Sequence, residues 1–110
     1  RILVLGLAFK ENCPDLRNTR VVDIVRSLQD CNLEVDLHDP WVSAEDARTE
    51  YGLTLVDRPN DADYDAIILA VGHENFKQLG GQGLRALGKA QCVLYDVKHI
   101  LPRDVADGRL

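Results

Sequence analysis

The sequence predicts a small doubly wound, Rossmann-like α/β domain, in which helices cover both faces of a parallel sheet. The clearest evidence is the segment 64–71, because residues 66–71 are continuously apolar, as expected for a strand that is buried on both faces. Strand-like runs also alternate with helix-like segments of about ten residues. Right-handed crossovers bring such strands into one parallel sheet, and a length of 110 residues suits a single domain.

The N-terminal part predicts one strand, one loop and one helix. Residues 1–7 form a short apolar run that reads as a buried strand and opens into a polar loop over residues 10–18. Beyond the loop, apolar residues recur at three- and four-residue intervals, which predicts a helix. Asn18 or Thr19 is available to cap its first turn. The apolar positions of this helix are Val21, Val22, Val25 and Leu28.

The middle of the chain predicts a second strand and a second helix. Residues 33–37 supply alternating apolar side chains, and Asp39-Pro40 ends the strand because proline cannot continue regular pairing. The segment 43–51 begins with a serine that can cap a helix and continues with good helix formers. Residues 53–56 add a short apolar run.

The remainder of the chain completes the sheet. Residues 64–71 form the most apolar strand, and residues 75–87 have a helical pattern that several glycines interrupt. The last strand is expected at residues 92–97. From Pro102 onward the chain is expected to form a loosely held tail. The interrupting glycines are Gly80, Gly81 and Gly83.

Composition excludes several functional classes. The formal net charge is −5, which disfavours binding to nucleic acids and to anionic membrane surfaces. There is no apolar run of about 20 residues that could span a membrane, and no signal peptide, so a cytoplasmic location is expected. Cys13, Cys31 and Cys92 lack the spacing of a disulfide framework or a zinc site and are expected to be reduced. Cys31 and Cys92 fall at a helix end and in a strand and are expected to belong to the core. The chain starts at Arg1, without a methionine, directly in a strand-like run, so it is expected to be a piece of a longer protein.

Open α/β sheets bind ligands beyond the carboxyl ends of their strands, where this sequence places several charged residues. Gly6 follows the first strand, but the G-x-G-x-x-G pattern that receives a dinucleotide pyrophosphate is absent, so independent NAD binding is not expected. The loop instead carries Lys10, Asp15 and Arg17, and basic residues near a helix start suit a diphosphate. On spacing alone, Lys10 and Arg17 could equally be solvated loop charges.

The same loop resembles a known motif. Residues 6–19 read Gly-Leu-Ala-Phe-Lys-Glu-Asn-Cys-Pro-Asp-Leu-Arg-Asn-Thr, similar to the G-x-A-F-K-x-x-x-x-D-x-R-x-S/T pattern that opens the C-terminal domain of UDP-glucose and GDP-mannose dehydrogenases. The resemblance continues through Asp39-Pro40, residues 70–76 and residues 95–98, and so covers essentially the whole chain. It is closest to the branch that oxidises UDP-N-acetylglucosamine or UDP-N-acetylgalactosamine for bacterial surface polysaccharides.

The resemblance implies roles for five residues. Phe9 and Lys10 match the pair that contacts the UDP-sugar, and Lys98 matches a basic substrate-binding position that is arginine in some relatives. A lysine there acts as a point charge rather than a bidentate donor. Arg17 matches the arginine that reaches NAD, and Asp15 is expected to support it. Lys10 and Lys98 are therefore expected to meet at one cleft.

The resemblance also implies what lies outside residues 1–110. The parent enzyme would oxidise the sugar C6 alcohol to a carboxylate with two NAD molecules, through a cysteine that this chain does not contain. NAD would be held mainly by a missing N-terminal domain, next to a missing central domain, in a homodimer. The chain alone would supply substrate binding, no catalytic residue and no activity.

Other chemistry-bearing residues have competing interpretations. Cys13 lies in the basic loop, but position alone does not make a thiol nucleophilic. His73 could be a general base, or a structural residue at a strand end. Asp39 could bind a ribose hydroxyl, or bond its own backbone in a turn. His38 and His99 lack the spacing of metal ligands, so no metal is expected.

Two other functions remain open. The chain could be a stand-alone interaction module of flavodoxin-like shape, in which the basic loop is merely solvated surface. Within the family, UDP-glucose 6-dehydrogenase and GDP-mannose 6-dehydrogenase remain alternatives to a UDP-N-acetylhexosamine enzyme.

Overall fold

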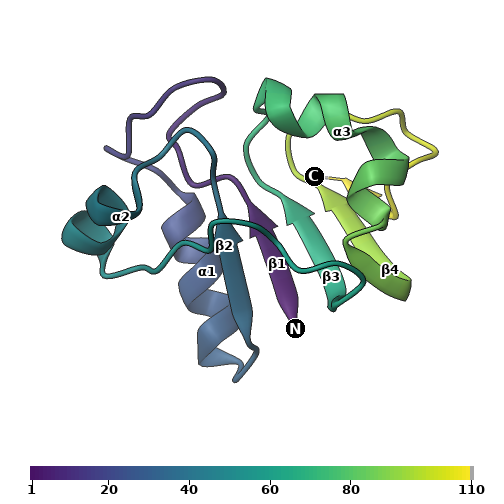
Figure 1. Ribbon diagram of the computed structural model, residues 1–110, viewed down its shortest axis with the longest axis horizontal. Helices are drawn as coiled ribbons and strands as arrows, with labels where there is room; N and C mark the ends of the chain where they lie inside the picture. The colour runs from purple at the N-terminus through teal and green to yellow at the C-terminus, as the bar shows by residue number, and fades with distance from the viewer. Residues whose placement is uncertain (110) are drawn as a thin grey trace.

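The computed structural model describes residues 1–109 and confirms the predicted fold class. Five strands of these residues form one parallel sheet in the order β2-β1-β3-β4-β5, with their carboxyl ends at one edge (Figure 1). The strands are β1 (Ile2–Leu5), β2 (Val35–His38), β3 (Tyr64–Leu69), β4 (Gly88–Asp96) and β5 (Gly108–Arg109). The helices are α1 (Val21–Asp30), α2 (Ala44–Tyr51) and α3 (Glu74–Arg85).

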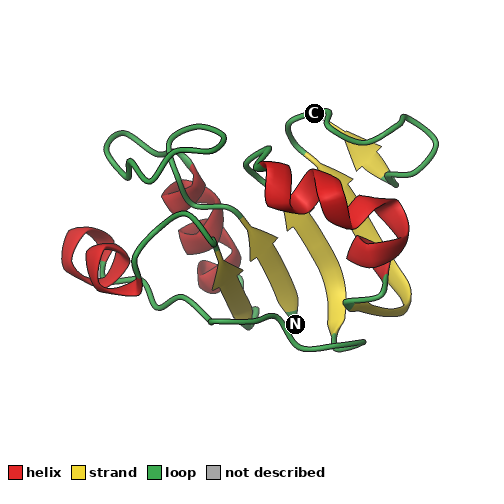
Figure 2. Ribbon diagram, turned by 45° about the horizontal axis from the view of Figure 1, so that its top comes forward, coloured by secondary structure: helices red, strands yellow, loops and turns green. Residues whose placement is uncertain are grey.

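Separate apolar clusters cover the two faces of the sheet. Because successive strand side chains point to opposite faces, Val4 packs with Val22 and Val25 of α1 on one side. Its neighbours Leu3 and Leu5 pack with the apolar face of α3 on the other side. Figure 2 shows α3 and α1 on opposite faces of the strands. Burial on both faces explains why the strands are so apolar.

The direction of winding reverses at β1. The chain steps from β1 to β2 on one side, then crosses back to β3 on the other side of β1. A reversal of this kind separates the loops at the carboxyl ends of the two neighbouring strands and leaves a crevice there. The β1–α1 loop and the residues after β3 border this crevice.

The two N-terminal helices start in different ways. Neither Asn18 nor Thr19 is the N-cap of α1, because that position is Arg20, which makes no side-chain capping hydrogen bond. Thr19 still contributes, since its Oγ1 accepts a hydrogen bond from Val21 N at 3.2 Å. Ser43 caps α2 as predicted, with its hydroxyl accepting from the amide three residues on at 3.0 Å. The cap prediction was therefore right for α2, whereas in α1 Thr19 bonds an amide of the first turn without being the N-cap residue.

Two other segments refine the sequence prediction. Residues 53–56 form no strand and touch β2 through an isolated bridge between Leu37 and Leu55. The helix that several glycines were expected to interrupt is observed as α3, with a kink at Gly80, whose φ of 66° lies in the left-handed region. Glycine adopts that conformation at little cost, so the helix can change direction there.

The expectation of a loosely held C-terminal tail was wrong. Leu101 is buried in the α3-side core, and β5 extends the sheet beyond β4. Asp107 fastens the tail, because its Oδ2 accepts hydrogen bonds from Leu94 N at 2.8 Å and from Arg85 Nη2 at 3.0 Å. The sequence offered no local sign of these contacts, since each joins Asp107 to a residue more than ten positions away.

Candidate functional site

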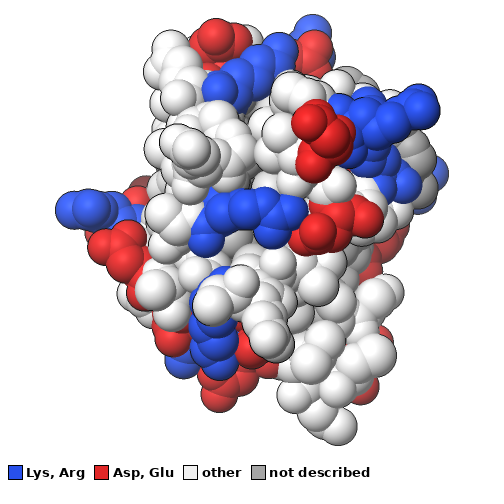
Figure 3. Space-filling view, turned by 90° about the vertical axis from the view of Figure 1, so that its right-hand side faces the viewer, with Lys and Arg blue, Asp and Glu red and all other residues white. Residues whose placement is uncertain are grey.

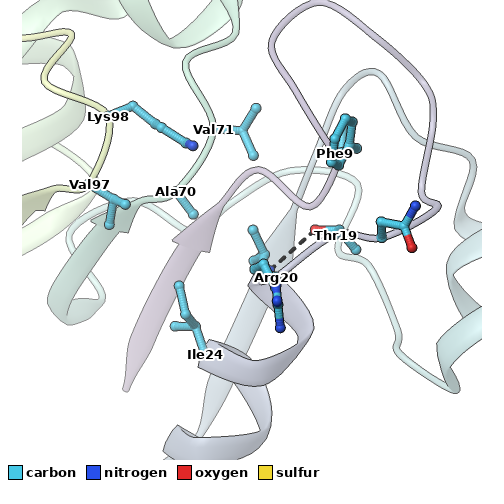
Figure 4. A pocket seen from close by; sticks show the side chains of 11 residues that line it. Phe9, Thr19, Arg20, Ile24, Ala70, Val71, Val97 and Lys98 are labelled. Atoms are coloured by element: carbon cyan, nitrogen blue, oxygen red, sulfur yellow. Dashed lines mark hydrogen bonds between the residues drawn. The ribbon is translucent and has the colours of Figure 1, made fainter.

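A cleft of about 220 Å³ lies at the crevice, between the β1–α1 loop, the start of α1 and the ends of β3 and β4 (Figure 4). It is therefore in the place where open α/β sheets bind their ligands. Most of its wall is small and apolar, with charged groups at the rim. The residues that line it are Ala8, Phe9, Asn18, Thr19, Arg20, Val21, Ile24, Ala70, Val71, Val97 and Lys98.

Phe9 and Lys98 enter this cleft from different elements, the β1–α1 loop and the end of β4 (Figure 4). Phe9 is 51% exposed, which is unusual for a phenylalanine and leaves part of its ring open to a planar or apolar group. Lys98 is exposed and adds a mobile positive charge. The cleft can thus accommodate a molecule with an anionic part and a flat part.

The first turn of α1 adds a second source of positive potential. Thr19, Arg20 and Val21 line the cleft, so the partial positive charge of the helix N-terminus faces it. Arg20 is exposed and its guanidinium lies 3.8 Å from the Asp23 carboxylate. Sequence reasoning did not select Arg20 or Val21 for the site, although they directly follow Thr19, the last residue of the loop motif.

Lys10 does not line this cleft, so the expected meeting of Lys10 and Lys98 is not seen in the described residues. The loop closes on itself directly before Lys10, because Phe9 N donates a hydrogen bond to Asp15 O at 2.7 Å. Asn12 then turns the chain with a φ of 54°. Lys10 consequently lies on the exposed outer part of the loop.

Asp15 and Arg17 form a close pair outside the cleft. Asp15 Oδ1 accepts hydrogen bonds from Arg17 N at 2.9 Å and Nε at 3.1 Å, and Oδ2 accepts from Nη2 at 3.0 Å. These hydrogen bonds from the side chain and backbone of Arg17 lower the pKa of Asp15 to about 2. The Arg17 side chain is 85% exposed, so Asp15 fixes the guanidinium while it faces outward. The pair borders a shallow hollow on the side of the molecule near α2.

The turn after β1 is unsuited to a dinucleotide. Leu7 N and Ala8 N, which follow Gly6, both donate to Asp39 Oδ2, at 2.7 and 2.9 Å. In a dinucleotide fold, backbone amides at this turn face the pyrophosphate, whereas here a buried carboxylate occupies them. The residues present therefore do not fit NAD at this turn.

The structure decides between the two interpretations of Asp39, a ribose ligand or a residue that bonds its own backbone in a turn. Asp39 is 4% exposed, and its Oδ1 accepts a hydrogen bond from Trp41 N at 2.8 Å, two residues on. Burial favours the neutral acid, but the hydrogen bonds from His73 and from three backbone amides outweigh burial and lower the pKa of Asp39. Asp39 is thus a charged structural residue that cannot reach a ribose.

His73 belongs to the same network. Its Nε2 lies 3.0 Å from Asp39 Oδ2, and its Nδ1 accepts a hydrogen bond from Asn12 N at 2.8 Å. The imidazole is fully buried, with the Trp41 ring stacked at a centroid distance of 6.0 Å. Both ring nitrogens are engaged and no part of the ring reaches solvent, so His73 is structural rather than a general base.

The cysteines lie in three environments. Cys92 is buried, and burial raises the pKa of its thiol. Cys13 is half-buried in the loop, and Cys31 is exposed at the end of α1. The expectation that Cys31 belongs to the core was therefore wrong. Residues 1–109 contain no group of three or more His, Cys, Asp or Glu side chains that could hold a metal ion.

On one face of the molecule, the surface charge is mixed rather than concentrated. On the face that Figure 3 shows, Lys and Arg side chains lie at separate places among Asp and Glu side chains. This face therefore lacks the continuous basic track that binds a polyphosphate backbone. The helices described within residues 1–109 are also too short to cross a bilayer.

Comparisons with known proteins agree on one family. Residues 3–103 match the model described as the UDP-binding domain of the UDP-glucose/GDP-mannose dehydrogenase family. The whole chain is 60% identical to a UDP-N-acetyl-D-glucosamine 6-dehydrogenase of Pseudomonas aeruginosa, and 99% of it is 51% identical to the same enzyme of Salmonella typhi. It spans 26% of the length of each. A UDP-glucose dehydrogenase structure from Pyrobaculum islandicum superposes with a TM-score of 0.73 and 28% identity, over 98% of this chain and 24% of that one.

Proposed function

The chain belongs to the UDP-glucose/GDP-mannose dehydrogenase family as a UDP-binding domain, and from that premise we propose that its cleft binds the nucleotide part of a UDP-N-acetylhexosamine. The parent protein would be an NAD-dependent 6-dehydrogenase acting in surface polysaccharide synthesis. The observation that carries this proposal is the convergence of Lys98, Phe9 and the start of α1 on one cleft. The high identity to two UDP-N-acetyl-D-glucosamine 6-dehydrogenases supports the acetamido sugar.

The cleft suggests how the nucleotide would lie. Lys98 and the N-terminus of α1 would neutralise the diphosphate, because both place positive charge at the rim. The exposed ring of Phe9 would pack against a flat or apolar part of the ligand. Lys10, which lies outside the cleft, would contact a part of the substrate that extends beyond this domain. Binding energy from these groups would orient the sugar for chemistry performed elsewhere.

The redox step is assigned to other parts of the parent protein. NAD would supply the hydride acceptor, and the turn after β1 does not fit it, so it would be held mainly by a further N-terminal domain. Arg17 would extend toward that cofactor, held in place by Asp15. The catalytic cysteine would also lie outside this chain, which would then have no activity alone. We propose that the parent enzyme is a cytoplasmic homodimer with a central domain beside this one.

Titration of the full-length protein with UDP-N-acetylglucosamine tests the proposal. Replacing Lys98 with methionine keeps the length of the side chain and removes its charge. Loss of a charge-assisted contact to phosphate should weaken binding by about ten- to a hundredfold. Lys77→Met is the matched control, because Lys77 is an exposed lysine of α3 outside the cleft, and it should change affinity less than twofold. Equal affinities of the two variants would refute the proposed role of the cleft.

A further inference from the structure

We infer that His73 and Asp39 act together as positioning residues, which hold the β1–α1 loop and its Phe9 in the conformation that receives the nucleotide. The inference deepens the proposed function and rests on it. It concerns residues that lie outside the cleft and outside the loop motif, at the ends of β2 and β3.

The loop is fastened on both sides of Phe9. On the N-terminal side, two of its backbone amides donate to Asp39 Oδ2 at 2.7 and 2.9 Å. On the C-terminal side, Asn12 N donates to His73 Nδ1 at 2.8 Å. His73 Nε2 lies 3.0 Å from the same Asp39 oxygen, so both fastenings meet at one carboxylate. A single buried unit therefore determines where Phe9 enters the cleft.

Hydrogen-bond geometry fixes the chemical form of His73. A backbone amide can only donate, so Nδ1 must carry a lone pair and the hydrogen must be on Nε2, which donates to Asp39. The ring cannot turn away easily, because it is fully buried and Trp41 and Phe76 pack against it at centroid distances of 6.0 and 5.5 Å. His73 is thus a rigid acceptor for the tip of the loop.

Asn12 extends the connection to α3. Its backbone has a φ of 54°, and its Oδ1 accepts a hydrogen bond from Glu74 N at 2.9 Å. The tip of the loop is therefore bonded twice to the start of α3: its backbone N–H donates to His73, the N-cap residue, and its side chain accepts from Glu74 N, in the first residue of the helix. A loop that is ordered before ligand binding loses less conformational entropy when the ligand arrives, which raises affinity.

Two substitutions separate the two bonds of His73. His73→Asn places an acceptor near the position of Nδ1 and loses the donor to Asp39, whereas His73→Gln reaches Asp39 and leaves Asn12 N without an acceptor. In the full-length enzyme, His73→Gln should raise the Kd and the KM for UDP-N-acetylglucosamine about fivefold, as expected for one lost hydrogen bond. His73→Asn should change both less than twofold. The kcat should change less than the KM in both variants, because Phe9, the residue that this network positions in the cleft, would contact the nucleotide and not the reacting carbon.

Controls distinguish this role from general stability and from the proposed function. His38→Asn alters another histidine at a strand end, bonded at Nδ1 to Val56 O at 3.0 Å, and should leave affinity unchanged. If the buried substitutions unfold the protein, Asn12→Gly tests the loop from the surface, since glycine tolerates the positive φ and removes only the bond to Glu74 N; a Kd rise of about threefold is then expected.

Different results would overturn the positioning role and the proposed function. Equal effects of His73→Gln and His73→Asn on KM in folded proteins would overturn the positioning role. An unchanged Kd for Asn12→Gly would also overturn it, because loosening the tip of the loop would then not affect binding. Binding by the wild-type protein would leave the proposed function standing in either case. Failure of the wild-type protein itself to bind UDP-N-acetylglucosamine would overturn both.

Discussion

Replacing Asp39 with asparagine should destabilise the domain strongly, although the two side chains have the same shape. Asp39 accepts four hydrogen bonds, three at Oδ2 and one at Oδ1. An asparagine can accept only through one oxygen, so its NH2 group would face Trp41 N, a second donor. These two donors, facing each other without an acceptor, cost about 1–3 kcal/mol of stability. The remaining three hydrogen bonds lose the strength that a charged acceptor gives. Relief of carboxylate burial offsets part of the loss, which leaves about 2–4 kcal/mol.

Urea unfolding followed by fluorescence of the single tryptophan measures this loss directly, since Trp41 stacks on His73. With a slope of about 2 kcal/mol per molar urea, the midpoint should fall by about 1–2 M at pH 7. The pKa of Asp39 is lowered in the folded state, so its stabilisation is present above the ordinary value near 4 and is lost as the pH falls through the lower folded value. The difference in urea midpoint between the wild type and Asp39→Asn should therefore become smaller at acid pH. Equal midpoints at pH 7, or a gap independent of pH, would refute the reasoning.

Three further predictions follow from buried or strained positions. Gly6→Ala should lower the free energy of unfolding, measured in urea, by more than about 2 kcal/mol, because φ is +102° and a Cβ would lie 2.5 Å from Val71 Cβ. A variant as stable as the wild type would contradict this prediction. Tyr64→Phe should remove a tyrosinate absorbance change near pH 12, because burial, and to a smaller extent a hydrogen bond to a carboxylate, raises the pKa of Tyr64 to about 12. Loss of an absorbance change near pH 10 instead would contradict this prediction. A thiol reagent should label Cys31 well before Cys92, which is buried with a raised pKa, and equal rates on mass spectrometry would argue against the packing.

The sequence predicted those parts of the fold that depend on local patterns. The apolar run after Tyr64 became β3, and Ser43 caps α2, because neighbouring residues determine both features. The tail was mispredicted because Asp107 is held by partners 13 and 22 positions away. No local periodicity encodes such pairs, and in the sequence an aspartate of a loop looks the same whether it is only solvated or hydrogen-bonded to distant residues.

The sequence likewise predicted only part of the candidate site. A sequence motif selected Phe9, and a short segment after the last strand selected Lys98; the structure places both on one cleft. It does not place Lys10 there, because the loop closes through a backbone hydrogen bond that no side-chain pattern reveals. The link between Asp39 and His73 spans 34 positions, and sequence alone left both residues with two interpretations. Their geometry decides between those interpretations.

The central claim is that the cleft between the β1–α1 loop and the end of β4 binds UDP. Amide chemical-shift mapping of the isotope-labelled protein during titration with UDP tests it most directly. The largest shifts should fall on the cleft residues Phe9, Thr19, Val97 and Lys98, with little change around the separate hollow beside Leu79. Shifts concentrated at that hollow, or none at the cleft under saturating UDP, would contradict it.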